Sequence, residues 1–147
     1  MQPIRLIVFI FFIGKTFAQP LVIAHRGASA YKPENSISAF EEAIKMKADY
    51  IETDVHQTKD GIVVIMHDFT VNRTCRTCRK NDKIKNLSYA EFSRLKIRNT
   101  DEHPPSLDSA IKFINGRCKL LIEIKKGSSY YPGIENNILA IIKANNA

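Results

Sequence analysis

The segment LVIAHRG, residues 21–27, joins a short apolar run to a polar turn that contains a histidine, an arginine and a glycine. A run of this length predicts a buried strand, and the glycine after it indicates a tight turn. Two later segments, YIETDV at residues 50–55 and KLLIEIK at residues 119–125, also have the pattern of a strand. All three carry charged or imidazole side chains toward the carboxyl end, where α/β barrels place their functional groups.

Helical patterns lie between these strands. Apolar residues recur at helical spacing after Asn35 or Ser36, either of which can cap a helix. Ser88 and Glu91 form a capping box, and Gly116 ends a later helical pattern. We expect helices over about residues 37–46, 88–96, 106–116 and 134–144. This alternation predicts a parallel-sheet α/β fold, and the strands are about half those of a (β/α)8 TIM barrel, which takes roughly 250 residues. We therefore expect the N-terminal half of such a barrel.

The first 18 residues have the parts of a secretory signal peptide. They contain a basic Arg5, an apolar run over residues 6–13 and the small-x-small triplet Thr16-Phe17-Ala18. The apolar run is too short to cross a bilayer core, which needs about 20 residues. An uncleaved membrane anchor is the alternative. We expect cleavage after Ala18, export to the periplasm or out of the cell, and one domain over residues 19–147.

The chain has a formal net charge of +7 and three cysteines, Cys75, Cys78 and Cys118. The basic balance favours an anionic substrate or surface, whereas the scatter of the basic residues argues against a nucleic-acid interface. Cys75 and Cys78 can close a small disulfide loop in an oxidising compartment, which leaves Cys118 free or paired elsewhere. A single C-x-x-C pair supplies too few ligands for a structural zinc site.

The dipeptide Asp60-Gly61 predicts a two-residue hairpin turn between strand-like residues. That turn sets a register in which Asp54 lies directly opposite His67. The hairpin therefore returns His67 to the side of the acidic residues without a crossover helix. We expect His56 on the opposite face of the strand, away from the candidate site.

Glu52 and Asp54 share one face of a predicted strand, so their carboxylates can converge on one divalent cation. Glu123, near the end of the later strand, can add a third oxygen ligand. Ligand sets made of oxygen alone suit Ca²⁺ or Mg²⁺. Alternating acids more often mark a solvent-facing strand, but the apolar neighbours here indicate burial, and buried carboxylates need partners. We therefore expect a metal site made by Glu52, Asp54 and Glu123.

His25 and His67 flank this acidic cluster and suit proton transfer near neutral pH. Cleavage of a phosphodiester needs one group that takes a proton from the attacking oxygen and another that protonates the leaving alkoxide. Arg26 can bind a phosphoryl oxygen, bidentately if geometry allows, and Lys125 can add positive charge from the other side. The alternative for both cations is a salt bridge to the carboxylates.

An ordered set of motifs runs through residues 21–126: His25-Arg26-Gly27, Pro33-Glu34-Asn35, Ile51-Glu52-Thr53-Asp54-Val55, Asp60-Gly61, His67-Asp68, Asn72-Arg73-Thr74, Pro105-Ser106-Leu107 and Ile122-Glu123-Ile124-Lys125. This set resembles the glycerophosphodiester phosphodiesterase family. The resemblance implies a TIM barrel of the phospholipase-C-like phosphodiesterase type, and hydrolysis of glycerophosphodiesters to sn-glycerol 3-phosphate and an alcohol. It also implies one divalent cation, acid–base catalysis by the two histidines, and phosphate contacts from Arg26 and Lys125.

The sequence departs from the family pattern at Lys47, where glycine is usual, and at Cys75 and Cys78, where the family has glycine or small polar residues. We also expect the later barrel strands, and the pocket residues on them, to lie outside these 147 residues. Two alternatives stay open. One is a related phospholipase D that acts on sphingomyelin or lysophospholipid, and the other is a non-catalytic fragment that binds phosphate or lipid.

The head group of the substrate, the choice between Ca²⁺ and Mg²⁺, and the attacking oxygen (water or a neighbouring hydroxyl) are not determined by the sequence. The same is true of the oligomeric state. We expect a small-molecule substrate as the partner, with no nucleic acid and no stable membrane span in the domain.

Overall fold

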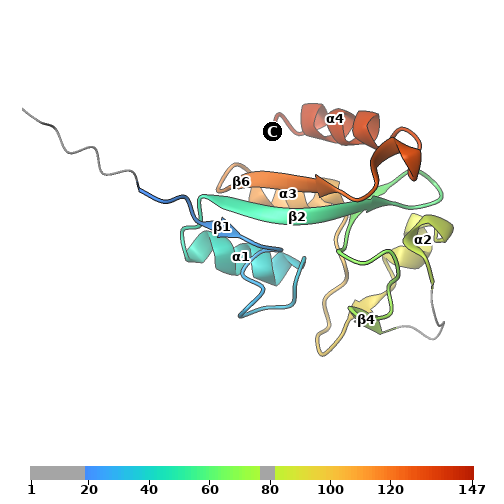
Figure 1. Ribbon diagram of the computed structural model, residues 1–147. Helices are drawn as coiled ribbons and strands as arrows, with labels where there is room; N and C mark the ends of the chain where they lie inside the picture. The colour runs from blue at the N-terminus through green and yellow to red at the C-terminus, as the bar shows by residue number, and fades with distance from the viewer. Residues whose placement is uncertain (1–18, 77–81) are drawn as a thin grey trace, which may run out of the picture.

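The computed structural model describes residues 19–76 and 82–147. Three parallel strands form the centre of its sheet, in the order β1 (Ile23–Ala24), β2 (Tyr50–Gln57) and β6 (Lys119–Ile124). The register pairs Ile23 with Tyr50, and Asp54 with Glu123. Figure 1 shows β2 and β6 side by side with their carboxyl ends pointing the same way. The predicted parallel strands are confirmed, whereas the predicted signal peptide lies outside the described residues.

Three helices pack against this sheet: α1 (Ile37–Lys45), α3 (Leu107–Ile114) and α4 (Ile134–Ala144). Ser36, one of the two predicted caps, accepts a hydrogen bond from a backbone N–H in the first turn of α1, and Ser106 does the same for α3. A 3-10 turn, η2 (Gly127–Ser129), leads from β6 to α4. No helix within the described ranges is long and apolar enough to cross a lipid bilayer.

The core lies between the sheet and these helices. Ile51 and Val55 of β2 are fully buried there, together with Phe40 of α1 and Leu107 of α3. Because side chains alternate along a strand, burial of Ile51 and Val55 on the helical side leaves the acidic residues of β2 on the other face. The packing of the helices against the sheet thus determines which face of β2 carries the candidate site.

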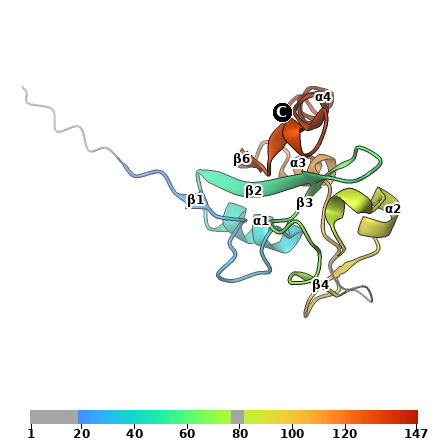
Figure 2. The same ribbon diagram turned by 45° about the vertical axis from the view of Figure 1, so that its right-hand side comes forward.

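A smaller unit of the fold, residues 58–105, lies between β2 and α3 and is called the insertion below. Its elements are β3 (Val63–Ile65), β4 (Cys75–Arg76), η1 (Ile84–Asn86), α2 (Tyr89–Phe92) and β5 (Lys96–Ile97). It has its own buried cluster, which consists of Val64, Met66, Val71, Cys75, Ile84, Leu87 and Phe92. Figures 1 and 2 both place α2 and β4 on the side of the sheet toward which β2 points.

The capping box at Ser88 and Glu91 forms as predicted, but α2 ends at Phe92 rather than near Lys96. The shorter helix follows from β5, because Lys96 and Ile97 pair with β4. Within β4, Cys75 is a buried free thiol, and burial raises its pKa to about 11. Cys118 is also free, whereas Cys78 lies outside the described residues, so the structure does not describe the suggested disulfide loop.

The predicted two-residue hairpin turn is wrong. The N–H of Thr58 donates to the carbonyl of Ile62, and the ladder then pairs Gln57 with Val63 and Val55 with Ile65. The connection therefore has three residues, with Gly61 in the left-handed conformation at φ 84°. The cause is local: the Thr58 hydroxyl donates to Asp60 Oδ1 and accepts from the N–H of Ile62.

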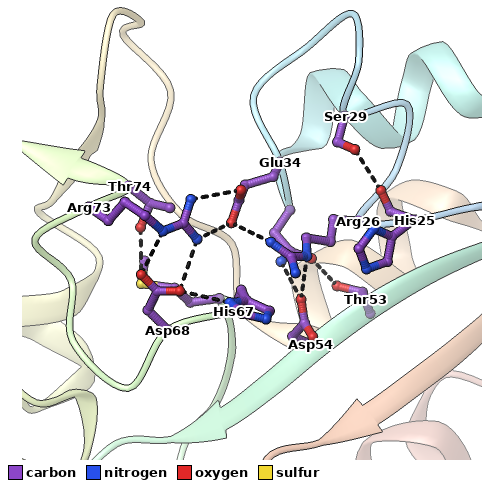
Figure 3. A network of polar contacts seen from close by, with 12 residues as sticks. His25, Arg26, Ser29, Glu34, Thr53, Asp54, His67, Asp68, Arg73 and Thr74 are labelled. Atoms are coloured by element: carbon purple, nitrogen blue, oxygen red, sulfur yellow. Dashed lines mark hydrogen bonds and ion pairs between the residues drawn. The ribbon is translucent and has the colours of Figure 1, made fainter.

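The longer turn shifts the register by one residue, which exchanges the faces of β3. Met66, not His67, donates its N–H to the carbonyl of Asp54. β3 ends at Ile65, and His67 follows in a loop rather than in the ladder. The predicted outcome, His67 beside Asp54, nevertheless holds, because the loop after β3 carries it there (Figure 3).

The turn after β1 depends on Gly27. Its backbone has φ 77°, and a Cβ added there would lie 2.8 Å from the Cβ and 2.8 Å from the carbonyl carbon of Ala39. We expect Gly27→Ala to lower the free energy of unfolding by about 3 kcal/mol, because it adds an overlap with the backbone of α1 to the cost of a left-handed alanine. Urea denaturation at neutral pH measures this change.

Gly116 supplies the matched control. It has φ 70°, but nothing lies within 4 Å of an added Cβ. Gly116→Ala therefore carries only the conformational cost, about 1 kcal/mol. Equal losses for the two variants would contradict the proposed close approach of the turn to α1.

Candidate active site

The carboxylates of Glu52, Asp54 and Glu123 converge where β2 and β6 run side by side. One oxygen from each lies within 4.8 Å of the others. Their environments differ: the Asp54 side chain is fully buried, Glu52 is largely buried and Glu123 is half exposed. The parallel register explains the convergence, since it sets Asp54 directly beside Glu123. The predicted acidic cluster is therefore present.

Arg26 and Lys125, which follow the ends of β1 and β6, reach the same cluster. The ammonium of Lys125 lies 2.8 Å from Asp54 Oδ1 and 2.6 Å from Glu123 Oε1. The Arg26 Nε lies 3.5 Å from Asp54 Oδ2, and the Arg26 backbone N–H donates to Glu52 Oε2 at 2.9 Å. Both cations thus form the salt bridges that the sequence left open as an alternative.

Arg26 adopts a left-handed backbone conformation with φ 57°. That conformation costs a residue other than glycine about 1 kcal/mol or more, and such strain tends to occur at functional sites. Here it aims the Arg26 N–H at Glu52 and leaves the guanidinium beside Asp54. The strained turn after β1 therefore fixes Arg26 against two carboxylates of β2.

Asn35, predicted only as a possible helix cap, is a buried partner of Asp54. Its amide donates to Asp54 Oδ2 at 2.8 Å, and its oxygen accepts from the Thr53 hydroxyl at 2.8 Å. Burial raises the pKa of Asp54, but the adjacent Lys125 ammonium and the hydrogen bond from Asn35 outweigh it, so the pKa lies below its ordinary value. Burial lowers the pKa of Lys125, whereas Asp54 and Glu123 raise it, with a net increase. Both groups are charged at neutral pH.

The chemistry of this donor set fits a hard divalent cation. Three carboxylates supply oxygen ligands alone, which Ca²⁺ and Mg²⁺ prefer. Asp54 Oδ1 is buried and accepts no well-aligned hydrogen bond, although Lys125 lies nearby. An ionised oxygen in this condition gains from a positive ligand. Glu52, Asp54 and Glu123 can therefore hold one cation.

The two candidate histidines lie at this cluster. His25 follows β1, its side chain is 67% exposed, and its Nε2 lies 3.9 Å from Glu52 Oε2. His67 places its Nδ1 2.7 Å from Asp68 Oδ1. Figure 3 shows the two imidazoles to either side of Asp54. A substrate that contacts the carboxylates would therefore have an imidazole on each side.

The expectation for His56 is wrong. Positions 52, 54 and 56 alternate onto one face of β2, so His56 lies on the side of the site, fully buried. Its Nε2 lies 3.2 Å from the carbonyl oxygen of His67, and its Nδ1 lies 2.7 Å from the Tyr131 hydroxyl. Because a carbonyl only accepts, Nε2 carries the proton and Nδ1 accepts from Tyr131. His56 thus holds the backbone of His67.

Burial lowers the pKa of His56 to about 4, against 6.5 for the exposed group. The unfolded chain therefore binds a proton at a higher pH than the folded protein does. The contribution of neutral His56 to stability is complete above pH 6.5 and is lost as the pH falls toward 4, by about 3 kcal/mol in total. We expect this loss in urea denaturation of the wild type, measured from pH 7 to pH 4.

Carboxylates also titrate in this pH range, so His56→Gln is the comparison that isolates the contribution of His56. The variant is less stable than the wild type at pH 7, because it loses the fit to Tyr131 and His67. The difference between the two proteins should shrink as the pH falls from 6.5 to 4. A difference that stays constant over this range would contradict a buried, neutral His56.

Three further charged residues at the site had no assigned role in the sequence: Glu34, Asp68 and Arg73. Arg73 of the insertion contacts both acids, and Glu34 also accepts from Arg26 Nη1 at 3.3 Å. Their motifs were recognised as family segments, but 39 positions separate Glu34 from Arg73, and spacing alone does not pair them. The opposite charges of Arg73 and the two acids are the one feature of these motifs that suggests an ion pair.

The chain is similar to known proteins over most of its length. Residues 25–144 match the model of the glycerophosphoryl diester phosphodiesterase family. The chain is 40% identical over 133 residues to a glycerophosphodiester phosphodiesterase of Caldanaerobacter subterraneus subsp. tengcongensis, over 86% of this chain and 54% of that protein. It is 38% identical over 109 residues to glycerophosphodiester phosphodiesterase 1 of Homo sapiens, over 70% of this chain and 33% of that protein. The chain thus spans about half the length of most curated relatives it matches.

Solved structures match the fold. A phosphodiesterase from Oleispira antarctica, in complex with the product sn-glycerol-3-phosphate, gives a TM-score of 0.76 at 29% identity, over 86% of this chain and 53% of that chain. A glycerophosphodiester phosphodiesterase from Thermotoga maritima gives a TM-score of 0.71 at 29% identity, over 87% of this chain and 52% of that chain. These neighbours are TIM-barrel proteins, and this chain corresponds to about half of each. The predicted partial barrel is confirmed.

Proposed function

This chain belongs to the glycerophosphoryl diester phosphodiesterase family, and we propose that it hydrolyses glycerophosphodiesters to sn-glycerol 3-phosphate and an alcohol. The observation that carries this proposal is the cluster of Glu52, Asp54 and Glu123 with an imidazole on each side. The Oleispira antarctica neighbour, which holds sn-glycerol-3-phosphate as its product, supports the substrate class. Activity would make the protein a phosphoric diester hydrolase.

In this proposal Glu52, Asp54 and Glu123 hold one divalent cation, Ca²⁺ or Mg²⁺, which when bound supplies positive charge to phosphoryl oxygens. Arg26 and Lys125, which now pair with the carboxylates, would also contact the phosphate oxygens of the substrate. A guanidinium suits two oxygens at once, and an ammonium acts as a point charge. Both groups lie within 4 Å of a carboxylate oxygen at the cluster, so only small movements are needed.

His25 and His67 would move the protons. One imidazole takes a proton from the attacking oxygen as that oxygen bonds to phosphorus, and the other gives a proton to the alkoxide as its bond to phosphorus breaks. The positions of the two rings on either side of Asp54 support a division of these tasks. Proton exchange with water then restores both histidines. The attacking oxygen is either water, which gives sn-glycerol 3-phosphate directly, or a neighbouring hydroxyl of the substrate. The hydroxyl would give a cyclic phosphate, which water then opens to sn-glycerol 3-phosphate.

Residues 1–18 support a second proposal, that the protein is exported and that the domain begins at residue 19. The support is the basic, apolar and small-residue order of the segment. Expression with a reporter that functions only outside the cytoplasm tests export, and N-terminal sequencing of the product tests cleavage after Ala18. A full-length, cytoplasmic product would overturn both.

The experiment for the activity compares products. Purified protein with Ca²⁺ or Mg²⁺ is incubated with glycerophosphocholine and, separately, with sphingomyelin or lysophosphatidylcholine. We expect sn-glycerol 3-phosphate from glycerophosphocholine. Release of choline from the intact lipids alone would instead favour the phospholipase D alternative. Binding of inorganic phosphate without turnover of any substrate would favour a non-catalytic fragment.

A further inference from the structure

Arg73 connects the insertion to the turn before α1 through two carboxylates. Its Nε and Nη2 donate to Asp68 at 2.7 and 2.9 Å, and its Nη1 and Nη2 donate to Glu34 at 2.9 and 2.6 Å. Each carboxylate therefore meets two nitrogens of the same guanidinium, as Figure 3 shows. Only arginine offers this planar fork of donors.

The first carboxylate determines the state of His67. The hydrogen bond from Arg73 does most to lower the pKa of Asp68, to about 2, so Asp68 is ionised and can only accept. His67 Nδ1, 2.7 Å from Asp68 Oδ1, must therefore carry a proton. In the neutral ring this leaves the lone pair on Nε2. Asp68 thus fixes both the tautomer and the orientation of the imidazole.

The second carboxylate restrains Arg26. Glu34 Oε1 accepts from Arg26 Nη1 at 3.3 Å and from Arg73 Nη2 at 2.6 Å. Glu34 is ionised at neutral pH, because the hydrogen bond from Arg73 lowers its pKa more than burial raises it. Arg73 and Arg26 therefore meet at one shared oxygen. The position of Arg73 sets that of Glu34, and Glu34 in turn limits where the guanidinium of Arg26 can lie.

His67 has particular need of such support. It lies beyond the end of β3, so the strand ladder does not hold it. Among the described residues, His56 holds its carbonyl oxygen, and Asp68 holds its ring. Groups on loops are positioned less accurately than groups on strands, and an error of about 1 Å can cost about 10²-fold in rate.

We propose that Arg73 is a positioning residue for the reaction, which holds the His67 imidazole through Asp68 and the Arg26 guanidinium through Glu34. This inference rests on the proposed function. Arg73 acts indirectly: its side chain is half exposed, and its ion pairs are with Glu34 and Asp68. Exposed ion pairs contribute little to stability, so the main effect of Arg73 is on the geometry of the site.

The kinetic test uses Arg73→Lys, which keeps the charge and removes the fork. We expect kcat to fall by about 10–100-fold and KM to rise, because both His67 and Arg26 lose their restraint. Asp68→Asn should lower kcat without a change in KM, and Glu34→Gln should mainly raise KM. In the Asp68→Asn background, Arg73→Lys should lower kcat no further, since both act through one path. A further, multiplicative loss in the double variant would overturn the proposed path.

Arg76→Lys is the matched control. Arg76 lies in the same insertion, is similarly exposed, and contacts Asp101 and the carbonyl of Thr100 rather than the site. We expect its kcat and KM to equal those of the wild type. Thermal unfolding of each variant corrects the rates for the folded fraction, so a folding defect does not imitate loss of positioning.

A measurement without substrate separates this inference from the proposed function. In protein labelled with ¹⁵N-histidine, the His67 signals are identified by their loss in His67→Gln. We expect a proton on Nδ1 in the wild type and in Arg76→Lys, and a shift toward the other tautomer in Asp68→Asn and Arg73→Lys. If these tautomers are observed but the protein hydrolyses no substrate, the proposed function is rejected and the positioning of His67 by Arg73 still stands. An unchanged tautomer in both Asp68→Asn and Arg73→Lys would overturn the inference.

Discussion

Replacement of His67 by glutamine is expected to lower kcat for glycerophosphodiester hydrolysis by about 10²–10⁴-fold and to leave KM near the wild-type value. The loss is large because the imidazole transfers its proton in the transition state, while the phosphorus–oxygen bonds form and break, and contributes little to binding of the substrate. His67 has its Nδ1 engaged by Asp68, which leaves Nε2 for the substrate. The measurement is the initial rate of glycerol 3-phosphate release over a range of glycerophosphocholine concentrations.

His25→Gln should have a loss of similar size, since His25 is the second imidazole at the carboxylates. The double variant should be far less impaired than the product of the two single losses, because the two histidines act as one unit. His103→Gln is the matched control: His103 is exposed, and its ring contacts the carbonyl of Leu95 in the insertion. Its rate should equal that of the wild type.

Thermal stability should change little in His67→Gln, since about a third of the His67 side chain is exposed and its backbone contacts persist. A loss of rate would then report chemistry rather than unfolding. Hydrolysis unaffected by both His25→Gln and His67→Gln would reject the assignment of acid–base catalysis to these residues.

The carboxylate cluster could be predicted from the sequence because its three members lie on strands. Glu52, Asp54 and Glu123 belong to short apolar runs, and the carboxyl ends of parallel strands meet at one edge of a sheet. Period-two alternation then places Glu52 and Asp54 on one face. The same alternation places His56 on that face as well.

The hairpin was harder to predict, because Asp60-Gly61 fits two kinds of turn. A two-residue turn and a three-residue turn with glycine in the left-handed position use similar residues. Side-chain hydrogen bonds of Thr58 favour the longer turn, and the choice shifts the register by one residue. These contacts are local, but they involve Thr58 and Ile62, which lie outside the dipeptide that predicts the turn. The turn dipeptide alone therefore predicts the wrong partner for Asp54.

The structure of the insertion could not be predicted from hydrophobic periodicity. β4 and β5 have two residues each, and β5 replaces the last turn expected for α2. Strands so short leave no measurable periodicity. The contact of Arg73 with Glu34 joins a segment that follows β2 in the sequence to one that precedes it, and a single sequence contains no signal that pairs residues 39 positions apart. Charge complementarity becomes informative only after the fold has paired the segments.

Replacement of Asp54 by asparagine is expected to lower kcat/KM by about 10³-fold and to abolish the dependence of stability on divalent cations. Asp54 is the fully buried member of the carboxylate cluster, and its Oδ1 accepts no well-aligned hydrogen bond. Asparagine keeps the shape of the side chain but offers one neutral oxygen where a cation would meet an ionised carboxylate. Isothermal titration with Ca²⁺ and Mg²⁺ measures the loss of affinity directly.

Asp101→Asn is the matched control for this change. It removes the same charge from an exposed side chain, which pairs with Lys96 on the surface of the insertion. Its activity, cation affinity and cation-dependent rise in melting temperature should all remain as in the wild type. Exhaustive chelation should reduce the wild type and Asp101→Asn to the rate of Asp54→Asn, and should leave Asp54→Asn unchanged. The carboxylate cluster would have no role as a cation site if wild-type activity survived chelation, since Arg26 and Lys125 would then suffice to balance the charge of the phosphate.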